Sequence, residues 1–357
     1  MTLLLSNDDV GRLLTMPDCI AALEDAYAEL AEGRGVNRIR SDSLAPVKDR
    51  PEALYGLKSM DGIIPKFGVG AVRIDSDVVH WPKRGNTMVR EKVPAAGGRW
   101  VGLVLLFSCE TGEPLAIFPD GVMQHIRVGA TSGLGAKYMA RNDAHTVGIL
   151  GSGWQAQTQL SAICSVREID AIRCFSPTRE NREKFSKEMT EALGIEVKPV
   201  DSPEEAIKGV DVVMCASNAI DNIYFARWLQ PGIHLSSIKR PEIEVAAIKK
   251  CDRVASHSHE PTPMHFTTKG LKVVEKSEGK GWSVADQVDF TKMPTLPDMI
   301  VGRYKGRTND REITCFMNNL GMGYQFAAAG SVVYRKAVEQ GVGRQFPTEW
   351  FTQDVHP

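Results

Sequence analysis

The stretch Val147-Gly148-Ile149-Leu150-Gly151-Ser152-Gly153-Trp154-Gln155-Ala156 decides the fold of this 357-residue chain. Its apolar start predicts a buried strand, and the G-x-G-x-x-A spacing that follows predicts a tight turn into a helix. Gly151 permits the turn, Gly153 lets the backbone approach a pyrophosphate, and Ala156 allows close helix–strand packing. Free N–H groups at such a helix start bind phosphates. We therefore expect a dinucleotide site formed by Gly151, Ser152, Gly153, Trp154, Gln155 and Ala156.

Strand and helix patterns alternate around this turn. We predict strands over 146–150, 169–175, 197–200, 210–216, 234–238 and 253–255, and helices over 155–166, 179–193 and 204–206. Repeated βαβ units form a parallel sheet with helices on its faces. The predicted fold class is therefore α/β, with a Rossmann doubly wound parallel sheet over residues 126–320.

The N-terminal third has a different pattern. Residues 7–33 predict a helix or helix pair broken at Pro17-Asp18, and 37–120 predict short strands, including a hairpin over 100–118. The basic, Gly/Pro-rich segment 82–98 is interpreted as a mobile loop. Helices are predicted over 129–139 and 323–340, and we expect the latter to pack on the first part. Residues 1–125 and 321–357 should then form a separate α+β domain.

Composition excludes several classes of partner. The net charge is -1 and 24% of residues are charged, so the overall field attracts neither nucleic acid nor an acidic membrane. The seven cysteines are scattered and lack a C-x-x-C pair, which favours a reducing compartment. The N-terminus lacks a signal-peptide pattern, and no apolar run is long enough to span a bilayer. A cytoplasmic location is predicted.

The end of the second strand indicates which dinucleotide binds. It reads Phe175-Ser176-Pro177-Thr178-Arg179, with hydroxyls and an arginine where NAD binders usually carry an acid. Ser176, Thr178 and Arg179 suit a 2′-phosphate, so NADP(H) is favoured and NAD(H) stays open. Ser217 and Asn218, at the end of a later strand, are further cofactor candidates.

Several motifs outside the turn resemble those of the ornithine cyclodeaminase/mu-crystallin family. They are Asp120-Gly121, the run His125-Ile126-Arg127-Val128-Gly129-Ala130-Thr131-Ser132, the segment 209–213 and Leu229-Gln230-Pro231-Gly232. The resemblance covers nearly the whole chain. It implies a homodimer whose second domain supplies the dimer contact and part of the substrate site. It also implies hydride exchange between a nicotinamide and the α-carbon of an amino or imino acid.

The resemblance assigns roles to individual residues. Arg127 matches the arginine that holds the substrate carboxylate, and Arg40 lies near a second one. Ile238, Lys239 and Asn319 fall in segments that contact the cofactor. Where many members carry a catalytic lysine, this chain has Arg73, which can hold a carboxylate or polarise an imine. Lys58 is then the candidate for the catalytic amine.

These departures argue against ornithine cyclodeamination. The aspartate of that reaction is missing, and the chain reads Lys239-Arg240-Pro241-Glu242 instead. Arg40, Lys58, Arg73 and Arg127, with Lys239 or Arg240, predict a strongly cationic pocket. We therefore expect an NAD(P)H-dependent imine reductase or amino-acid dehydrogenase that acts on an acidic imino or amino acid. A cyclodeaminase-like lyase and a non-catalytic NADP-dependent binding protein are the alternatives.

One further motif contains residues that bind metals in other proteins. His257, His259 and His265 include an H-x-H pair, which zinc could bind. The two prolines of this segment and the missing fourth ligand favour an ordinary loop. We predict no metal.

Overall fold

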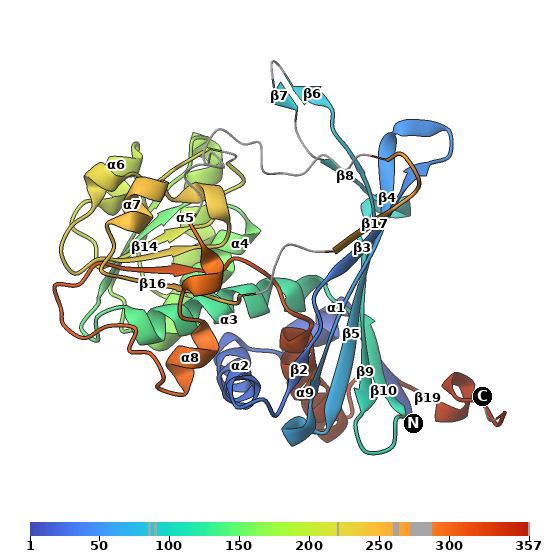
Figure 1. Ribbon diagram of the computed structural model, residues 1–357. Helices are drawn as coiled ribbons and strands as arrows, with labels where there is room; N and C mark the ends of the chain where they lie inside the picture. The colour runs from blue at the N-terminus through green and yellow to red at the C-terminus, as the bar shows by residue number, and fades with distance from the viewer. Residues whose placement is uncertain (85–86, 89–90, 220, 260–263, 272–287, 356–357) are drawn as a thin grey trace.

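A seven-stranded parallel sheet carries the glycine turn. The computed structural model describes every residue except 85–86, 89–90, 220, 260–263, 272–287 and 356–357 (Figure 1). The sheet comprises β11 (Thr146–Leu150), β12 (Ala171–Phe175), β13 (Val197–Pro199), β14 (Val212–Cys215), β15 (His234–Ser237), β16 (Arg253–Ser256) and β18 (Thr314–Met317). Their order is β13-β12-β11-β14-β15-β18-β16, with every pair parallel. This confirms the Rossmann fold class, and the glycine turn follows β11, beside the point where the strand order reverses.

Helices bury both faces of this sheet. They are α4 (Trp154–Val166), α5 (Arg179–Leu193), α6 (Pro203–Ile207), α7 (Val245–Lys249) and α8 (Leu296–Ile300). Val147 and Ile149 pack in one apolar cluster with residues of α4 and α5, whereas Leu150 packs in a second cluster with residues of α6 and α7. The strand side chains are therefore buried on both sides, as parallel sheets require.

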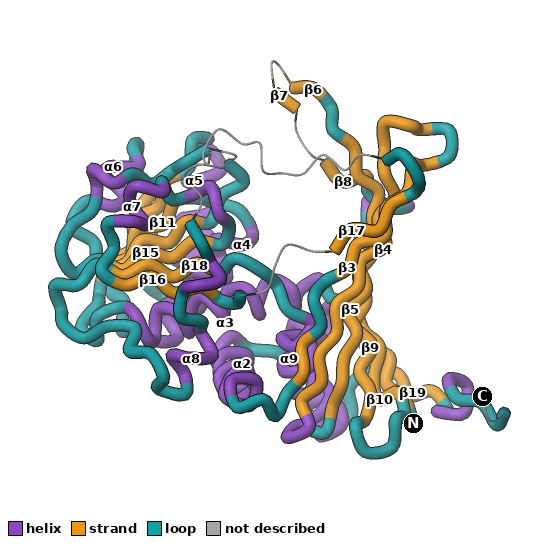
Figure 2. The backbone as a smooth tube through the Cα atoms, viewed as in Figure 1, coloured by secondary structure: helices purple, strands orange, loops and turns teal. Residues whose placement is uncertain are grey.

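A ten-stranded sheet forms the other half of the molecule (Figures 1 and 2). Its order is β17-β3-β4-β5-β9-β10-β1-β19, with β2 on β4 and β8 on β5. The strands are β1 (Thr2–Leu4), β2 (Val36–Asn37), β3 (Ser41–Val47), β4 (Arg50–Ile64), β5 (Val69–His80), β8 (Glu91–Val93), β9 (Val101–Ser108), β10 (Pro114–Pro119), β17 (Met264–Thr267) and β19 (Arg344–Phe346). The strands nearest the two termini, β1 and β19, pair with each other.

One face of the large sheet is covered by helices. These include α1 (Asn7–Leu13), α2 (Met16–Ala31) and α9 (Gly323–Gln340), and α9 packs directly on β4 and β5. This confirms that the C-terminal helix returns to the first part of the chain. A Cβ on Gly323 would lie 2.4 Å from the backbone nitrogen of Asp61, so the helix crosses β4 at backbone contact. Gln325 and Phe326, in the first turn of this helix, are both fully buried.

The structure corrects two predictions of secondary structure. The helix expected from residue 129 begins earlier, as α3 (Gly121–Met139), because packing against α2 and α4 outweighs the weak helix propensity of 121–128. The segment 82–98 is not a simple loop: β6 (Lys83–Arg84) pairs with β7 (Thr87–Met88), and β8 pairs with β5. Residues 85–86 and 89–90 of this segment lie outside the described residues.

Two further points complete the fold. The sequence pattern did not predict β18, whose four residues lie between β15 and β16. No helix in the described part of the chain is long and apolar enough to cross a membrane. The division at residues 125 and 321 stays a prediction.

Candidate active site

The glycine turn fits a pyrophosphate. Gly151 has φ +130°, and a Cβ there would lie 2.2 Å from the carbonyl oxygen of Ala216, so only glycine fits. Gly153 is the N-cap of α4 and has no side chain to occupy the free N–H groups. A Cβ on Gly153 would meet nothing within 4 Å, so the space before the helix start is open. Ala156 is fully buried against the sheet, as expected.

The other residues of the turn are Ser152, Trp154 and Gln155. Ser152 is half-buried, and Gln155 has one buried side-chain oxygen without a hydrogen-bond partner. The Trp154 indole is exposed and stacks on the His125 ring of α3, with ring centroids 3.5 Å apart. Burial, followed by the nearby Arg127, lowers the pKa of His125 to about 4, so this ring is neutral at physiological pH.

The residues at the end of β12 lie where the second strand meets α5. Ser176 is buried, and its carbonyl accepts a hydrogen bond from Arg182 at 3.2 Å. Thr178 is the N-cap of α5 and its side chain makes no capping bond. Arg179 is exposed and pairs with Glu183, with its Nε 2.7 Å from the carboxylate. Such a surface pair is weak and can exchange for a phosphate.

A buried carboxylate organises the ends of β14 and β15. The backbone N–H and the hydroxyl of Ser217 donate to one oxygen of Glu242 at 2.6 and 2.9 Å, and the Ser237 hydroxyl donates to the other at 2.9 Å. Burial raises the pKa of Glu242 despite these bonds. Lys239 turns away from this carboxylate and donates to the carbonyl of Ala219.

The remaining cofactor candidates are dispersed. Asn218 is exposed and Ile238 half-buried, and the side chain of Arg240 lies outside the described residues. The Asn319 amide donates to the Ser258 carbonyl at 3.0 Å.

Lys58 and Arg73 lie on the face of the large sheet that α9 covers. Side chains alternate along β5, so Arg73, Asp75 and Asp77 share one face. Lys58 of β4 is directly opposite Asp75 and opposite Asp42 of β3, and all three side chains are buried. The Lys58 amine hydrogen-bonds to Asp77 and lies 3.7 Å from Asp75.

Arg73 is paired as well. Its Nε donates to Asp120 at 2.6 Å, and one terminal nitrogen donates to Gln124 at 3.3 Å. Arg40 forms a two-bond pair with Asp42, both at 2.7 Å. Lys92 of β8 lies 2.8 Å from Asp77. Four cations of this region thus face four aspartates, so the expected strongly cationic pocket is wrong. The aspartates were missed because the sequence does not show which strands pair.

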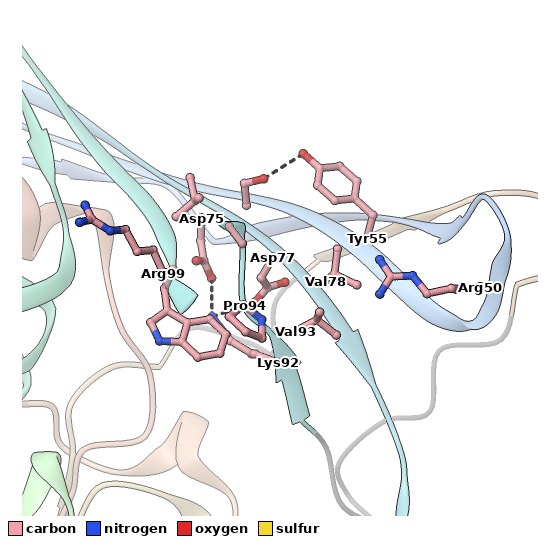
Figure 3. Close-up of a pocket in the computed structure, with 13 residues that line it drawn as sticks. Arg50, Tyr55, Asp75, Asp77, Val78, Lys92, Val93, Pro94 and Arg99 are labelled. Atoms are coloured by element: carbon pink, nitrogen blue, oxygen red, sulfur yellow. Dashed lines mark hydrogen bonds and ion pairs between the residues drawn. The ribbon is translucent and has the colours of Figure 1, made fainter. Parts of the chain in front are cut away.

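A pocket opens beside these paired charges, at the point along β5 where its hydrogen-bonded neighbour changes from β9 to β8. Its volume is about 280 Å³, and its walls include Asp75, Asp77 and Lys92 on one side and Tyr55 on the other (Figure 3). Hydrogen bonds from Lys58 and Lys92 outweigh burial and hold the pKa of Asp77 below its usual value. The Asp77 carboxylate is therefore charged at neutral pH.

Arg127 of α3 differs from the other cations. It is buried, and one terminal nitrogen donates to the Gln325 side-chain oxygen at 2.8 Å. Its Nε has no hydrogen-bond partner, and no carboxylate of the described residues pairs with it. Its guanidinium lies 5.1 Å from the centre of the Phe326 ring, and that of Arg73 lies 5.7 Å from it. Burial, and then Arg73, lower the pKa of Arg127 to about 10, so it stays charged. A buried, uncompensated cation favours an anionic ligand.

The three histidines of the H-x-H segment separate. His257 is buried and bonds to Tyr27 at 2.7 Å. His259 donates to the Met293 carbonyl, and His265 lies 3.8 Å from Asp42. Among the described residues no three His, Cys, Asp or Glu side chains form a metal-binding group.

A family comparison agrees with this geometry. The model of the ornithine cyclodeaminase/mu-crystallin family matches residues 87–341, which is more than half of the chain. The chain belongs to this family. The match includes Arg127 and the glycine turn.

Individual relatives match along the whole chain. The Δ1-pyrroline-2-carboxylate reductase of Bacillus cereus is 28% identical, covering 96% of this chain and 99% of that protein. The alanine dehydrogenase of Archaeoglobus fulgidus is 27% identical over 96% of this chain and 97% of that protein. The structure of Thermococcus litoralis Δ1-pyrroline-2-carboxylate reductase with NADH and L-proline matches with TM-score 0.77 and 28% identity. It covers 97% of this chain and all of that one.

Proposed function

We propose that this family member is an NAD(P)H-dependent imine reductase, or an amino-acid dehydrogenase running the reverse reaction, that acts on a carboxylate-bearing imino or amino acid. Arg127 is the observation that carries the proposal, because it is a buried cation that forms no ion pair with a carboxylate of the described residues. The relatives that reduce Δ1-pyrroline-2-carboxylate or oxidise alanine also act on α-carboxylates. The open space at the start of α4 supplies the place for the cofactor's pyrophosphate.

The charge balance favours a substrate with one carboxylate over the acidic one expected from sequence. Arg40, Lys58, Arg73 and Lys92 are offset by aspartates, so among these cations and Arg127, all of them in the described part of the chain, Arg127 is the one left without an ion pair. A monocarboxylic imine would neutralise it, whereas a second carboxylate would meet Asp75, Asp77 and Asp120. A cyclic imino acid or a 2-imino acid with an uncharged side chain fits this balance.

The chemistry needs a positioned carboxylate and a proton source. NAD(P)H, when bound at the glycine turn, would supply the hydride for the carbon of the C=N bond. Arg127 holds the carboxylate, which fixes the adjacent imine carbon in one orientation, and such orientation accounts for much of the rate. The imine nitrogen needs a proton, and we assign its delivery to Lys58, whose ammonium Asp77 holds in place.

The cofactor preference is proposed as NADP(H), with NAD(H) also accepted. Thr178 and Arg179 lie at the end of β12 without an acidic residue among 175–179, where NAD binders usually carry one for the ribose hydroxyls. Arg179 is available because its pair with Glu183 is exposed.

A homodimer is proposed through the face of the large sheet that lies opposite α9. This face exposes apolar side chains on β4 and β9, the two strands that flank β5: Tyr55, Leu57, Ile63, Val101 and Leu103. Exposed apolar side chains gathered on one face of a sheet mark an interaction site, and a second copy is the partner that a dimeric family implies. Leu57→Arg should convert a dimer to a monomer in light scattering, whereas Val338→Arg, at an exposed apolar residue of α9, should not.

Turnover is tested by following loss of NADPH or NADH absorbance with cyclic imino acids, and with 2-oxo acids plus ammonia or methylamine. We expect turnover with monocarboxylic imines and a loss of about tenfold to hundredfold in kcat/KM for Arg127→Met. Absence of turnover with every substrate, despite tight nucleotide binding, would contradict the proposal.

A further inference from the structure

A continuous set of buried hydrogen bonds connects Arg127 to the segment after β18. Gln325 accepts from Arg127, and its amide nitrogen donates to the Thr131 hydroxyl at 2.6 Å. The Thr131 oxygen lies 3.2 Å from the Tyr27 hydroxyl, which bonds to His257 at 2.7 Å. The last bond of this series joins His257 to the Leu320 carbonyl, at 2.6 Å.

Each polar group in this chain has a defined orientation. Since the Leu320 carbonyl can only accept, Nδ1 of His257 carries the proton and Nε2 accepts from Tyr27. The oxygen of Gln325 faces two donors, Arg127 and the Met322 N–H, so its nitrogen faces Thr131. Tyr27 gives its proton to His257, so the single hydroxyl proton of Thr131 goes to the Tyr27 oxygen, 3.2 Å away, and the series of hydrogen bonds is unbroken. The Arg127 backbone carbonyl, 2.9 Å from the Thr131 oxygen, is the alternative acceptor of that proton. The network therefore contacts Arg127 at its guanidinium, through Gln325.

These residues are almost inaccessible to solvent. Tyr27, Thr131 and Gln325 are 0% exposed and His257 is 1% exposed. Burial lowers the pKa of His257 to about 4, so its ring is neutral and the orientation of its bonds does not change between pH 6 and 9. Buried polar networks that are fully satisfied hold one geometry, and a partly broken one is costly.

The network joins segments that are distant in sequence. Tyr27 belongs to α2, Arg127 and Thr131 to α3, His257 follows β16, Leu320 follows β18, and Gln325 lies on α9. Leu320 lies in the segment directly after the parallel-sheet strand β18, at the carboxyl edge of the sheet, where the glycine turn also lies. The hydrogen bonds therefore relate the position of the carboxylate-binding arginine to that of the parallel sheet.

We propose that four residues hold the Arg127 guanidinium at a fixed position relative to the cofactor-binding sheet. These positioning residues are Tyr27, His257, Thr131 and Gln325. This inference rests on the proposed function, since it assumes that Arg127 binds a carboxylate. None of the four contacts the substrate. They orient Arg127, and so they act on carboxylate affinity and on the alignment of the imine carbon.

Tyr27→Phe is the sharpest test, because it removes a single oxygen atom and keeps the ring. Tyr324→Phe is the matched control, since Tyr324 is a second buried tyrosine, which donates to the Ala26 carbonyl of the same helix α2 at 2.9 Å. Affinity for L-proline, measured by calorimetry on the NADP+ complex, and KM for imine should both weaken about tenfold in Tyr27→Phe only. Nucleotide affinity should change less than twofold in both variants.

His257 provides a rescue experiment. His257→Leu removes both hydrogen bonds and should weaken L-proline affinity and raise the imine KM as Tyr27→Phe does. His257→Gln offers one N–H donor and one oxygen acceptor, and should recover most of the affinity. A merely structural role predicts instead that all variants lose thermal stability while L-proline affinity and the imine KM stay at the parent's values.

The outcomes separate the two proposals. If the parent binds L-proline or reduces imines and Tyr27→Phe matches it, the positioning network is wrong and the proposed function stands. If Tyr324→Phe weakens L-proline affinity as much as Tyr27→Phe does, the network is likewise overturned. If the parent neither binds L-proline nor reduces any imine, the proposed function fails, and the network falls with it.

Discussion

Arg73 and Asp120 form a buried ion pair in which Nε of the arginine donates to the carboxylate at 2.6 Å. Arg73 stands where the family resemblance places a lysine, so its charge could be read as a second anchor for the substrate. The pair offsets that charge. The substrate specificity of the site therefore depends on how the aspartates balance the cations.

Asp120→Asn should shift specificity towards dicarboxylic imines. The change removes the negative charge of Asp120, and the other carboxylate paired with Arg73, that of Asp75, lies 3.7 Å away. The positive charge of Arg73 is then less fully compensated. The ratio of kcat/KM for a dicarboxylic over a monocarboxylic imine should rise about tenfold or more. Asp143→Asn, which removes an exposed partner of Arg141, is the control and should leave the ratio unchanged. An unaltered ratio in Asp120→Asn would show that the site does not select by charge.

Lys58→Arg should lower kcat about a hundredfold or more while KM for the imine stays within a few-fold. Arginine keeps the charge beside Asp77 but cannot release a proton at neutral pH. Steady-state kinetics at several pH values checks this. Retention of full kcat would remove Lys58 from the proton-transfer step.

Arg179→Ala should raise KM for NADPH about tenfold and leave KM for NADH nearly unchanged. A guanidinium near a 2′-phosphate contributes a charge-assisted hydrogen bond that the ribose hydroxyl of NADH lacks. Arg335→Ala is a close control, because Arg335 also pairs with a glutamate four residues on, at the surface of α9. Equal effects on both nucleotides would argue against the NADP preference.

Stability should fall as the pH drops below about 6.5. Burial lowers the pKa of His234 to about 3 and that of His257 to about 4, so below pH 6.5 the unfolded state binds protons that the folded state does not. Each histidine then removes about 1.4 kcal/mol of unfolding free energy per pH unit. Denaturant unfolding at pH 7, 6 and 5 measures the slope. His234→Gln should make it shallower by one proton, and the exposed His145→Gln should not alter it.

Glu242→Gln should become more stable relative to the parent as the pH rises from about 5 to about 8. Burial raises the pKa of this carboxyl, so the folded state favours the protonated form, and the charged form destabilises the fold at higher pH. Glutamine can accept from Ser217 and donate to Ser237, so the hydrogen bonds persist. A constant difference in unfolding free energy across this pH range would contradict the assignment.

The sequence by itself determined the local elements of the parallel sheet. The strand over 146–150 and the helices over 179–193 and 323–340 were predicted at their observed bounds, because turn glycines and apolar periodicity are local signals. The glycine turn and Arg127 were identifiable for the same reason, since short motifs carry them. The NADP preference, the dimer and the roles of the site residues stay predictions.

Only the tertiary structure decided the electrostatics of the site. Asp42, Lys58 and Asp75 come from three strands, and their side chains meet only because the strand register sets them opposite one another. Gln325 bonds to Arg127, 198 positions away in sequence, because α9 crosses the sheet with Gly323 in direct contact with the backbone of β4. Charge balance depends on distance in space, and a linear sequence lists charges without their partners. For that reason a pocket that looked strongly cationic in the sequence has, in the described part of the fold, four cations paired with aspartates and Arg127 without an ion pair.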